Sequence, residues 1–185
     1  MAATTVSIRR RTRAAIVALM TITAAGVAVA TGPAAHALSS TTCTGTSHIT
    51  YTPGLTNTPQ TVQYDETDTF SSCLSSDPTL TSGRFFVSVD LPGASCLALP
   101  SLTTNTPYPI TWNNGNTSNV DLSFTDVVAE GIEQVTGTGP VTGGEFLGAN
   151  ATIIWLYTVP DPLQCLTSPG VTSQPGTLTA QITGL

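Results

Sequence analysis

Apolar and polar residues alternate along several short segments between residues 48 and 182. The clearest segments are 48–51, 61–64, 85–90, 108–112, 120–125 and 177–182, where every second side chain is largely apolar. Successive side chains of a β-strand point to opposite faces, so this pattern has the period of a strand. It predicts antiparallel strands with one face on a core and the other face in water.

Turn-forming residues separate these segments, and no helix is expected beyond residue 37. Thirteen prolines and sixteen glycines are spread along the chain, and no ten-residue window keeps apolar side chains at helical spacing. Short strands between turns indicate one all-β domain. We therefore predict an antiparallel β-sandwich, Ig-like or related, with about seven to nine strands.

The turn near residue 114 allows a sharper prediction. Apolar side chains should share a face, which pairs Ile110 with Val120 and Tyr108 with Leu122. That register predicts a three-residue loop over 114–116, with one residue in the left-handed conformation.

The first 37 residues differ from the rest of the chain. Four arginines at positions 9, 10, 11 and 13 precede an apolar run over 14–30, and the small-residue triplet Ala35-His36-Ala37 follows. This order predicts a signal peptide over 1–37 and a secreted domain over 38–185. An uncleaved membrane anchor is the alternative, although the small residues favour cleavage and release from the membrane. The arginines also fit a twin-arginine signal, but Thr12-Arg13-Ala14 lacks its apolar follow-on, which favours the general export route.

Removal of the leader would leave a strongly acidic protein. Arg84 is the one Lys or Arg beyond residue 37, whereas all eleven Asp and Glu lie there. Nucleic-acid binding depends on basic side chains that neutralise phosphates. We therefore expect no nucleic-acid partner. Anionic membrane surfaces are disfavoured for the same reason.

The four cysteines, Cys43, Cys73, Cys96 and Cys165, all follow the leader. An even number of cysteines in an exported chain predicts two disulfides, with three connectivities open. A zinc site would need ligands at short spacing, which is absent. We favour Cys43–Cys73 with Cys96–Cys165, because a hairpin near 55–59 would bring the first two together.

Several short motifs resemble recurring elements of small exported β-rich proteins of actinobacteria. They span most of the mature chain and lie at 43–45, 51–55, 110–118, 143–149 and 162–165. The resemblance implies a β-rich fold and an exported location. It implies no activity, because that group has none assigned to our knowledge.

The chain offers little of the usual catalytic equipment. His48 is the only histidine after the leader, no G-x-S-x-G motif accompanies it, and it is interpreted as a surface strand residue. We expect no cofactor, since no glycine-rich stretch carries the lysine of a phosphate-binding loop. The acids Glu130, Glu133, Asp121 and Asp126 leave a carboxylate-dependent hydrolase open as an alternative.

Two binding hypotheses remain. Asp65, Glu66 and Asp68 form a calcium candidate, although the glycine and later glutamate of an EF-hand are missing. The aromatics Trp112, Trp155 and Tyr157 could form an exposed platform for sugar stacking, with burial in the core as the competing interpretation.

These observations favour a non-enzymatic extracellular binding or surface-interaction module. Its partner would be an extracellular polysaccharide or a protein. The alternatives are the exported hydrolase and an inhibitor of secreted proteases, whose reactive loop would lie within 91–106, around Cys96.

Overall fold

A computed structural model describes residues 39–99 and 106–184. The elements in these ranges are β1 (Ser40–Leu55), β2 (Gln60–Ser75), β3 (Gly83–Ala94), β4 (Thr106–Trp112), β5 (Thr117–Ala129), β6 (Ile132–Gly144), β7 (Asn150–Thr158), the short 3-10 helix η1 (Gln164–Leu166) and β8 (Val171–Thr183). Over the same residues, no helix is both long enough and apolar enough to cross a membrane.

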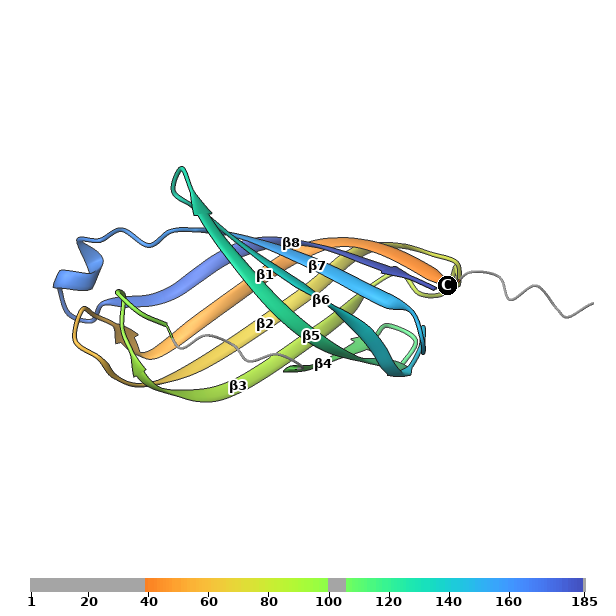
Figure 1. Cartoon of the computed structure of the whole chain (residues 1–185), viewed down its shortest axis with the longest axis horizontal. Helices are drawn as coiled ribbons and strands as arrows, with labels where there is room; N and C mark the ends of the chain where they lie inside the picture. The colour runs from red at the N-terminus through yellow and green to blue at the C-terminus, as the bar shows by residue number, and fades with distance from the viewer. Residues whose placement is uncertain (1–38, 100–105, 185) are drawn as a thin grey trace, which may run out of the picture. The chain divides into compact units, whose positions relative to one another are not determined.

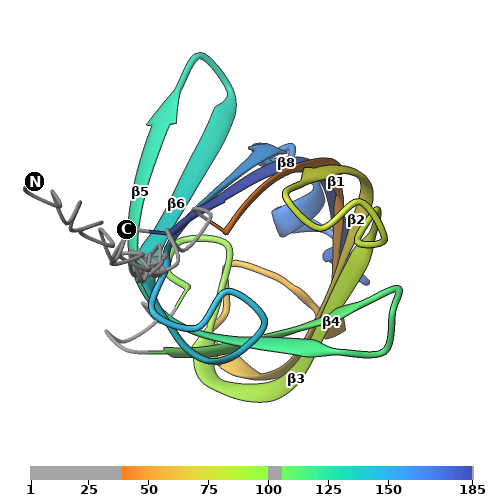
Figure 2. The same ribbon diagram turned by 90° about the vertical axis from the view of Figure 1, so that its right-hand side faces the viewer.

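The eight strands form one closed barrel (Figures 1 and 2). Each strand runs antiparallel to the next, and β8 returns to pair with β1. This closing ladder runs from the pair Ser40–Thr183 to the pair Thr50–Ser173, followed by an irregularity before Leu55. The strands that lie furthest apart in sequence are therefore joined by one of the longest ladders.

The predicted all-β architecture, antiparallel pairing and strand number are confirmed. The predicted sandwich is corrected, because a single sheet closes on itself. Alternating polarity indicates one apolar face per strand, and that face can cover a second sheet or line a barrel. The pairing of β1 with both β2 and β8 decides the question.

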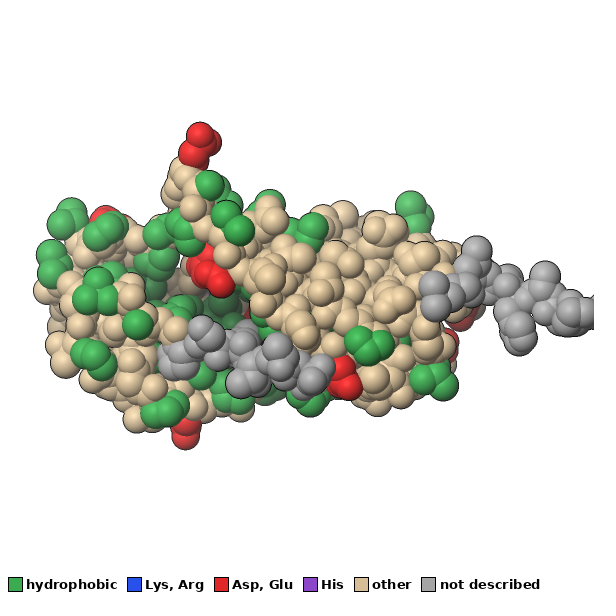
Figure 3. All heavy atoms as spheres, in the orientation of Figure 1, with side chains coloured by type: hydrophobic (Ala, Val, Ile, Leu, Met, Phe, Trp, Pro, Cys, Tyr) green, Lys and Arg blue, Asp and Glu red, His purple; other side chains and the backbone are tan. Residues whose placement is uncertain are grey.

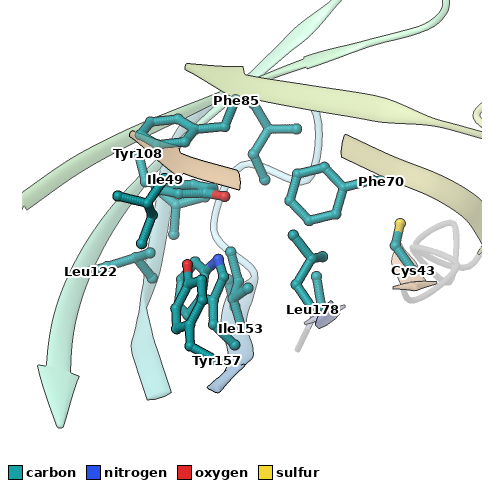
Figure 4. Packing of buried hydrophobic residues seen from close by; sticks show 14 of the residues in the cluster. Cys43, Ile49, Phe70, Phe85, Tyr108, Leu122, Ile153, Tyr157 and Leu178 are labelled. Atoms are coloured by element: carbon teal, nitrogen blue, oxygen red, sulfur yellow. The ribbon is translucent and has the colours of Figure 1, made fainter. Parts of the chain in front are cut away.

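The core lies inside the barrel, where every second side chain of each strand points. In β1 the inner positions include Ile49 and Tyr51, whereas Thr44, Thr46 and His48 are exposed on the outer face. Figure 4 shows residues from several strands, among them Phe85, Tyr108, Leu122 and Tyr157, meeting in this interior. Threonine-rich outer positions suit long strands, because β-branched side chains favour extended backbone.

Both disulfides have the expected pairing. Cys43 lies directly opposite Cys73 in the β1–β2 ladder, and the two cysteines are bonded. The bond between Cys96 and Cys165 joins the segment after β3 to η1, which lies between β7 and β8. The second bond therefore ties the end of β3 to a segment that precedes β8.

The β4–β5 register differs by two residues from the prediction. Tyr108 pairs with Val120 and Ile110 with Ser118, so the apolar faces match but the loop covers 113–115. Gly115 has φ of 87° and takes the left-handed position that closes the loop. Asn113 Oδ1 also accepts hydrogen bonds from the backbone N–H groups of Thr81 and Ser82. These bonds hold Asn113 inside the loop.

The β5–β6 hairpin extends away from the barrel wall at its tip (Figure 2). Ala129 pairs with Ile132 across a two-residue turn of Glu130 and Gly131, whose φ values are 52° and 79°. Two positive φ values in succession are the signature of a type I′ turn. Near this tip, Val127 and Val128 are exposed.

Candidate functional site

The inner face of β2 carries two acids in the middle of an otherwise aromatic and aliphatic row. Val62, Tyr64, Glu66, Asp68 and Phe70 alternate with outward residues, so all five face the interior. Glu66 is 8% exposed and Asp68 is 0% exposed. Two neighbouring carboxyl groups, spaced about 7 Å along the strand, are thus buried inside the barrel.

Asp68 is held through only one of its two oxygens. The indole Nε1 of Trp155 donates to Asp68 Oδ2 at 2.8 Å, and the Tyr108 hydroxyl donates to the same oxygen. Asp68 Oδ1 is buried and has no hydrogen-bond partner among the described residues. Burial raises the pKa of Asp68, and the hydrogen bonds it accepts partly oppose that rise.

Glu66 accepts hydrogen bonds at both oxygens. The Tyr64 hydroxyl donates to Oε2 at 2.7 Å, whereas the hydroxyls of Tyr157 and Ser47 donate to Oε1 at 3.1 and 3.4 Å. Burial and the nearby charge of Asp68 raise the pKa of Glu66 to about 7, although these hydrogen bonds lower it. Glu66 therefore changes charge near neutral pH.

The surrounding phenols remain protonated. Burial, followed by the charge of the acids, raises the pKa of Tyr64 and Tyr108 well above the ordinary tyrosine value. Burial also raises the pKa of Tyr157. These hydroxyls are therefore fixed hydrogen-bond donors toward the two carboxyl groups.

No basic side chain accompanies the acidic pair among the described residues. Arg84 is exposed and lies on β3 opposite Thr69, whose side chain is on the outer face of β2. His48 is exposed on the outer face of β1. The acids are thus stabilised by hydrogen bonds alone, without a counter-charge from the described chain.

A second polar group continues from the pair toward β6. The Tyr51 hydroxyl donates to Gln174 Oε1 at 3.0 Å. Gln174 Nε2 in turn donates to Glu133 Oε2 and to the carbonyl of Thr158, both at 3.2 Å. The rings of Tyr51 and Tyr64 are in edge contact, with centroids 5.9 Å apart. Polar side chains therefore run from Asp68 to the half-buried Glu133.

Among the described residues, the barrel wall has a gap beside these side chains, where the ladder between β3 and β4 is short. Only two residue pairs, Gly83–Trp112 and Arg84–Thr111, join β3 to β4 in the described chain. The N–H of Trp112 bonds to Asn116 and the N–H of Asn113 bonds to Ser82, so odd-numbered N–H groups of β4 face β3.

Proline explains why this ladder ends. Beyond Thr111, the next two odd positions of β4 are Pro109 and Pro107. Proline has no N–H group, so neither residue can donate toward β3. From Phe85 onward, β3 has no strand on this side among the described residues.

We call the resulting opening the lateral recess. Its lining residues face the barrel interior yet remain partly exposed, because no strand of the described ranges covers them: Tyr64, Val87, Val89, Leu91, Phe124, Glu133 and Val135. In Figure 3, hydrophobic side chains line a hollow at the foot of the protruding β5–β6 hairpin, with acidic side chains at its rim. The buried Glu66 lies next to Tyr64 on the inner face of β2, at the floor of the recess.

Two other hollows are open depressions on the outside of the barrel. One, of about 540 Å³, is lined by residues that include Pro53, Gln60 and Pro169. The other, of about 500 Å³, is lined by residues that include Arg84 and Asn113. Neither lining contains a carboxylate, so the acidic pair is associated with the lateral recess alone among these three hollows.

The aromatics predicted as a binding platform lie inside the barrel. Trp112, Trp155 and Tyr157 are 2–4% exposed. They form no exposed stacking face; Trp155 and Tyr157 instead donate hydrogen bonds to the acidic pair. Trp112 donates to Ser118 at 2.8 Å, away from the acids.

The three acids of the calcium candidate do not converge. Glu66 and Asp68 point into the barrel, whereas Asp65 immediately precedes Glu66 along β2 and therefore lies on the outer face. The described residues contain no group of three potential metal ligands.

The other predicted acids have separate environments. Glu130 is at the hairpin turn, Asp126 is exposed, and Glu133 is half-buried on the recess. The proposed inhibitor loop lies partly outside the described residues, at 100–105; within the described part, Leu97 is exposed.

Sequence reasoning missed the acidic pair as an internal site. The signal was present, because the alternation of 62–70 places both acids on the same face as Val62, Tyr64 and Phe70. Comparison with protein-family models, with curated proteins and with solved structures gave no match. The resemblance to exported actinobacterial β-rich proteins therefore stays a prediction.

Proposed function

We propose that this protein is a non-enzymatic extracellular binding module whose ligand site is the lateral recess. The observation that carries the proposal is that Val87, Val89 and Leu91 face the barrel interior but keep solvent exposure. Val89 is 39% exposed although its strand partner Tyr64 is on the inner face. An apolar concavity with a few fixed polar groups is the usual form of a small-molecule site.

The hydrogen-bond pattern supports binding. Buried tyrosine hydroxyls hold Glu66 at both oxygens, which fixes the floor of the recess before any ligand arrives. Preorganised polar groups lower the entropic cost of association. Two disulfides, typical of oxidising compartments, agree with the proposed extracellular location.

A filling substitution tests the site. The purified protein would be titrated with a neutral polarity-sensitive dye, and Val87→Trp would be compared with Phe86→Trp. Val87 faces the recess, whereas Phe86 is 62% exposed on the outer face of the same strand. We expect Val87→Trp to reduce dye affinity at least tenfold and Phe86→Trp to leave it unchanged. Equal effects, or no dye binding to the native protein, would contradict the proposal.

A second candidate is a hydrolase that works through carboxyl groups. It is favoured by the pKa of Glu66, which burial and Asp68 raise to about 7, a value suited to proton transfer near neutral pH. Chromogenic esters and aryl glycosides would test it, with Glu66→Gln and the exposed-turn variant Glu130→Gln side by side. This candidate requires turnover that only Glu66→Gln abolishes.

A further inference from the structure

We propose that the ligand of the lateral recess is a small organic cation, an ammonium-type group carried on an apolar body. This inference rests on the proposed function and specifies its ligand class. It follows from the hydrogen-bonding groups, charges and rings that face the recess.

The recess presents acceptors and no free donors among the described side chains. The hydroxyls of Tyr64 and Tyr51 donate to Glu66 and Gln174. Both hydrogens of Gln174 Nε2 are used, by Glu133 and by the carbonyl of Thr158. Among the described side chains, an anionic ligand would therefore meet no free hydrogen-bond donor, whereas a donor-bearing cation would meet several acceptors.

The charge of the site has one sign. Glu66 lies at the floor, the fully buried Asp68 follows it on the inner face of β2, and Glu133 lies at the rim. Asp126 pairs with Val135, so its side chain shares the face of that recess residue. The single arginine of the described chain is on the outer face of β3. A ligand cation would supply the missing counter-charge.

Asp68 adds an acceptor that the chain leaves unused. Its Oδ1 is buried without a partner, next to Glu66 along β2. A buried polar atom without a hydrogen bond costs about 1–3 kcal/mol. A donor group reaching the floor of the recess would remove part of that cost.

The walls define the rest of the ligand. Val87, Val89, Leu91 and Val135 are aliphatic, which suits an apolar body. The rings of Tyr64 and Phe124 also border the recess, and aromatic faces attract cations. A cationic head on an apolar body therefore matches both the floor and the walls.

A matched series separates these contributions. Octylammonium, octyltrimethylammonium, octanol and octanoate share one chain and differ in the head group. Each would be titrated into the protein at pH 8 by calorimetry, with tryptophan fluorescence as a second readout because Trp155 contacts Asp68. We expect octylammonium to bind at least tenfold more tightly than octanol, and octanoate not to bind.

Variants on one hairpin provide the charge control. Glu133→Gln and Glu130→Gln remove the same charge, but only Glu133 borders the recess. We expect Glu133→Gln to weaken octylammonium binding at least fivefold and Glu130→Gln to have no such effect. Equal effects would indicate general attraction to an acidic protein and would overturn the cation site.

The outcomes distinguish the two proposals. If octanol binds as tightly as octylammonium and Val87→Trp blocks both, the recess is a binding site but the cation inference is wrong. If octanoate binds best, the inference is also wrong. If no compound binds and the neutral dye also fails, both proposals are overturned.

Discussion

At the scale of single residues, Glu66 makes the stability of the fold depend on pH. Burial and Asp68 raise its pKa from 4.5 to about 7, so the folded state holds a proton that the unfolded chain has released between these values. The free energy of unfolding should therefore fall as pH rises from about 5 to 7, by an amount on the order of a few kcal/mol. Urea unfolding at pH 5, 6, 7 and 8 measures this slope.

The Glu66→Gln variant checks the assignment. A glutamine does not titrate, so the slope between pH 5 and 7 should become shallower, with the part due to Asp68 remaining. Glu130→Gln, at the exposed hairpin turn, should keep the native slope. A native protein whose stability is flat over this range would show that Glu66 titrates normally.

Two substitutions of Asp68 separate the effect of its charge from the effect of the hydrogen bonds that it accepts. Asp68→Asn keeps an oxygen for the donors Trp155 and Tyr108, whereas Asp68→Ala leaves both without an acceptor. We expect the alanine variant to lose more than about 2 kcal/mol and the asparagine variant to lose much less. Thermal and urea unfolding measure both, and equal losses would contradict the hydrogen-bonding role.

Single residues also explain why the acidic pair was not predicted from the sequence. Glu66 and Asp68 belong to an acidic run that also contains Asp65, and such runs usually lie in solvent. Recognising the pair requires the strand to extend from Gln60 through Ser75, so that the acids share a face with Val62 and Phe70. The donors Tyr108, Trp155 and Tyr157 come from distant strands, which the alternation cannot identify.

At the scale of elements, β4 controls the opening of the wall. Replacing Pro107 and Pro109 with threonine would restore two N–H donors that face β3. We expect the double variant to slow amide hydrogen exchange over residues 85–91 and to weaken dye binding. Hydrogen exchange measured by mass spectrometry tests this, with β7 as an internal reference. Unchanged exchange in β3 would mean that the prolines do not set the gap.

Element prediction succeeded where alternation was strong and failed where glycine dominated. The segments 48–51, 120–125 and 177–182 lie in β1, β5 and β8 as expected. β6 was not predicted, because its sequence contains Gly137, Gly139 and Pro140. A side chain at Gly139 would meet the carbonyl oxygen of Asp121 at 1.8 Å, so glycine is required by close contact between β5 and β6.

At the scale of the whole molecule, closure of the barrel could not be derived from local pattern. Each strand shows only that it has an apolar face; the pairing of β1 with β8 joins residues more than a hundred positions apart. The disulfide connectivity was predictable, because Cys43 and Cys73 flank one hairpin.

The two disulfides should stabilise different parts of the barrel against local opening. Cys43–Cys73 lies within a long ladder, whereas Cys96–Cys165 anchors the end of β3, which has no strand on its open side among the described residues. Replacing either pair with alanine should cost about 2–5 kcal/mol. Only loss of Cys96–Cys165 should accelerate hydrogen exchange at the end of β3 and in η1. Matching exchange maps for the two variants would contradict this.

Two prolines open the wall through the chemistry of the backbone, whereas the lining depends on side chains at other positions. Entrance and selectivity are therefore encoded by separate residues. Positions 87, 89, 91, 124 and 135 could be diversified together while 107 and 109 stay fixed. Each variant in such a library would keep the same opening between β3 and β4. The barrel is thus a natural starting frame for engineered receptors whose specificity changes without a change of access.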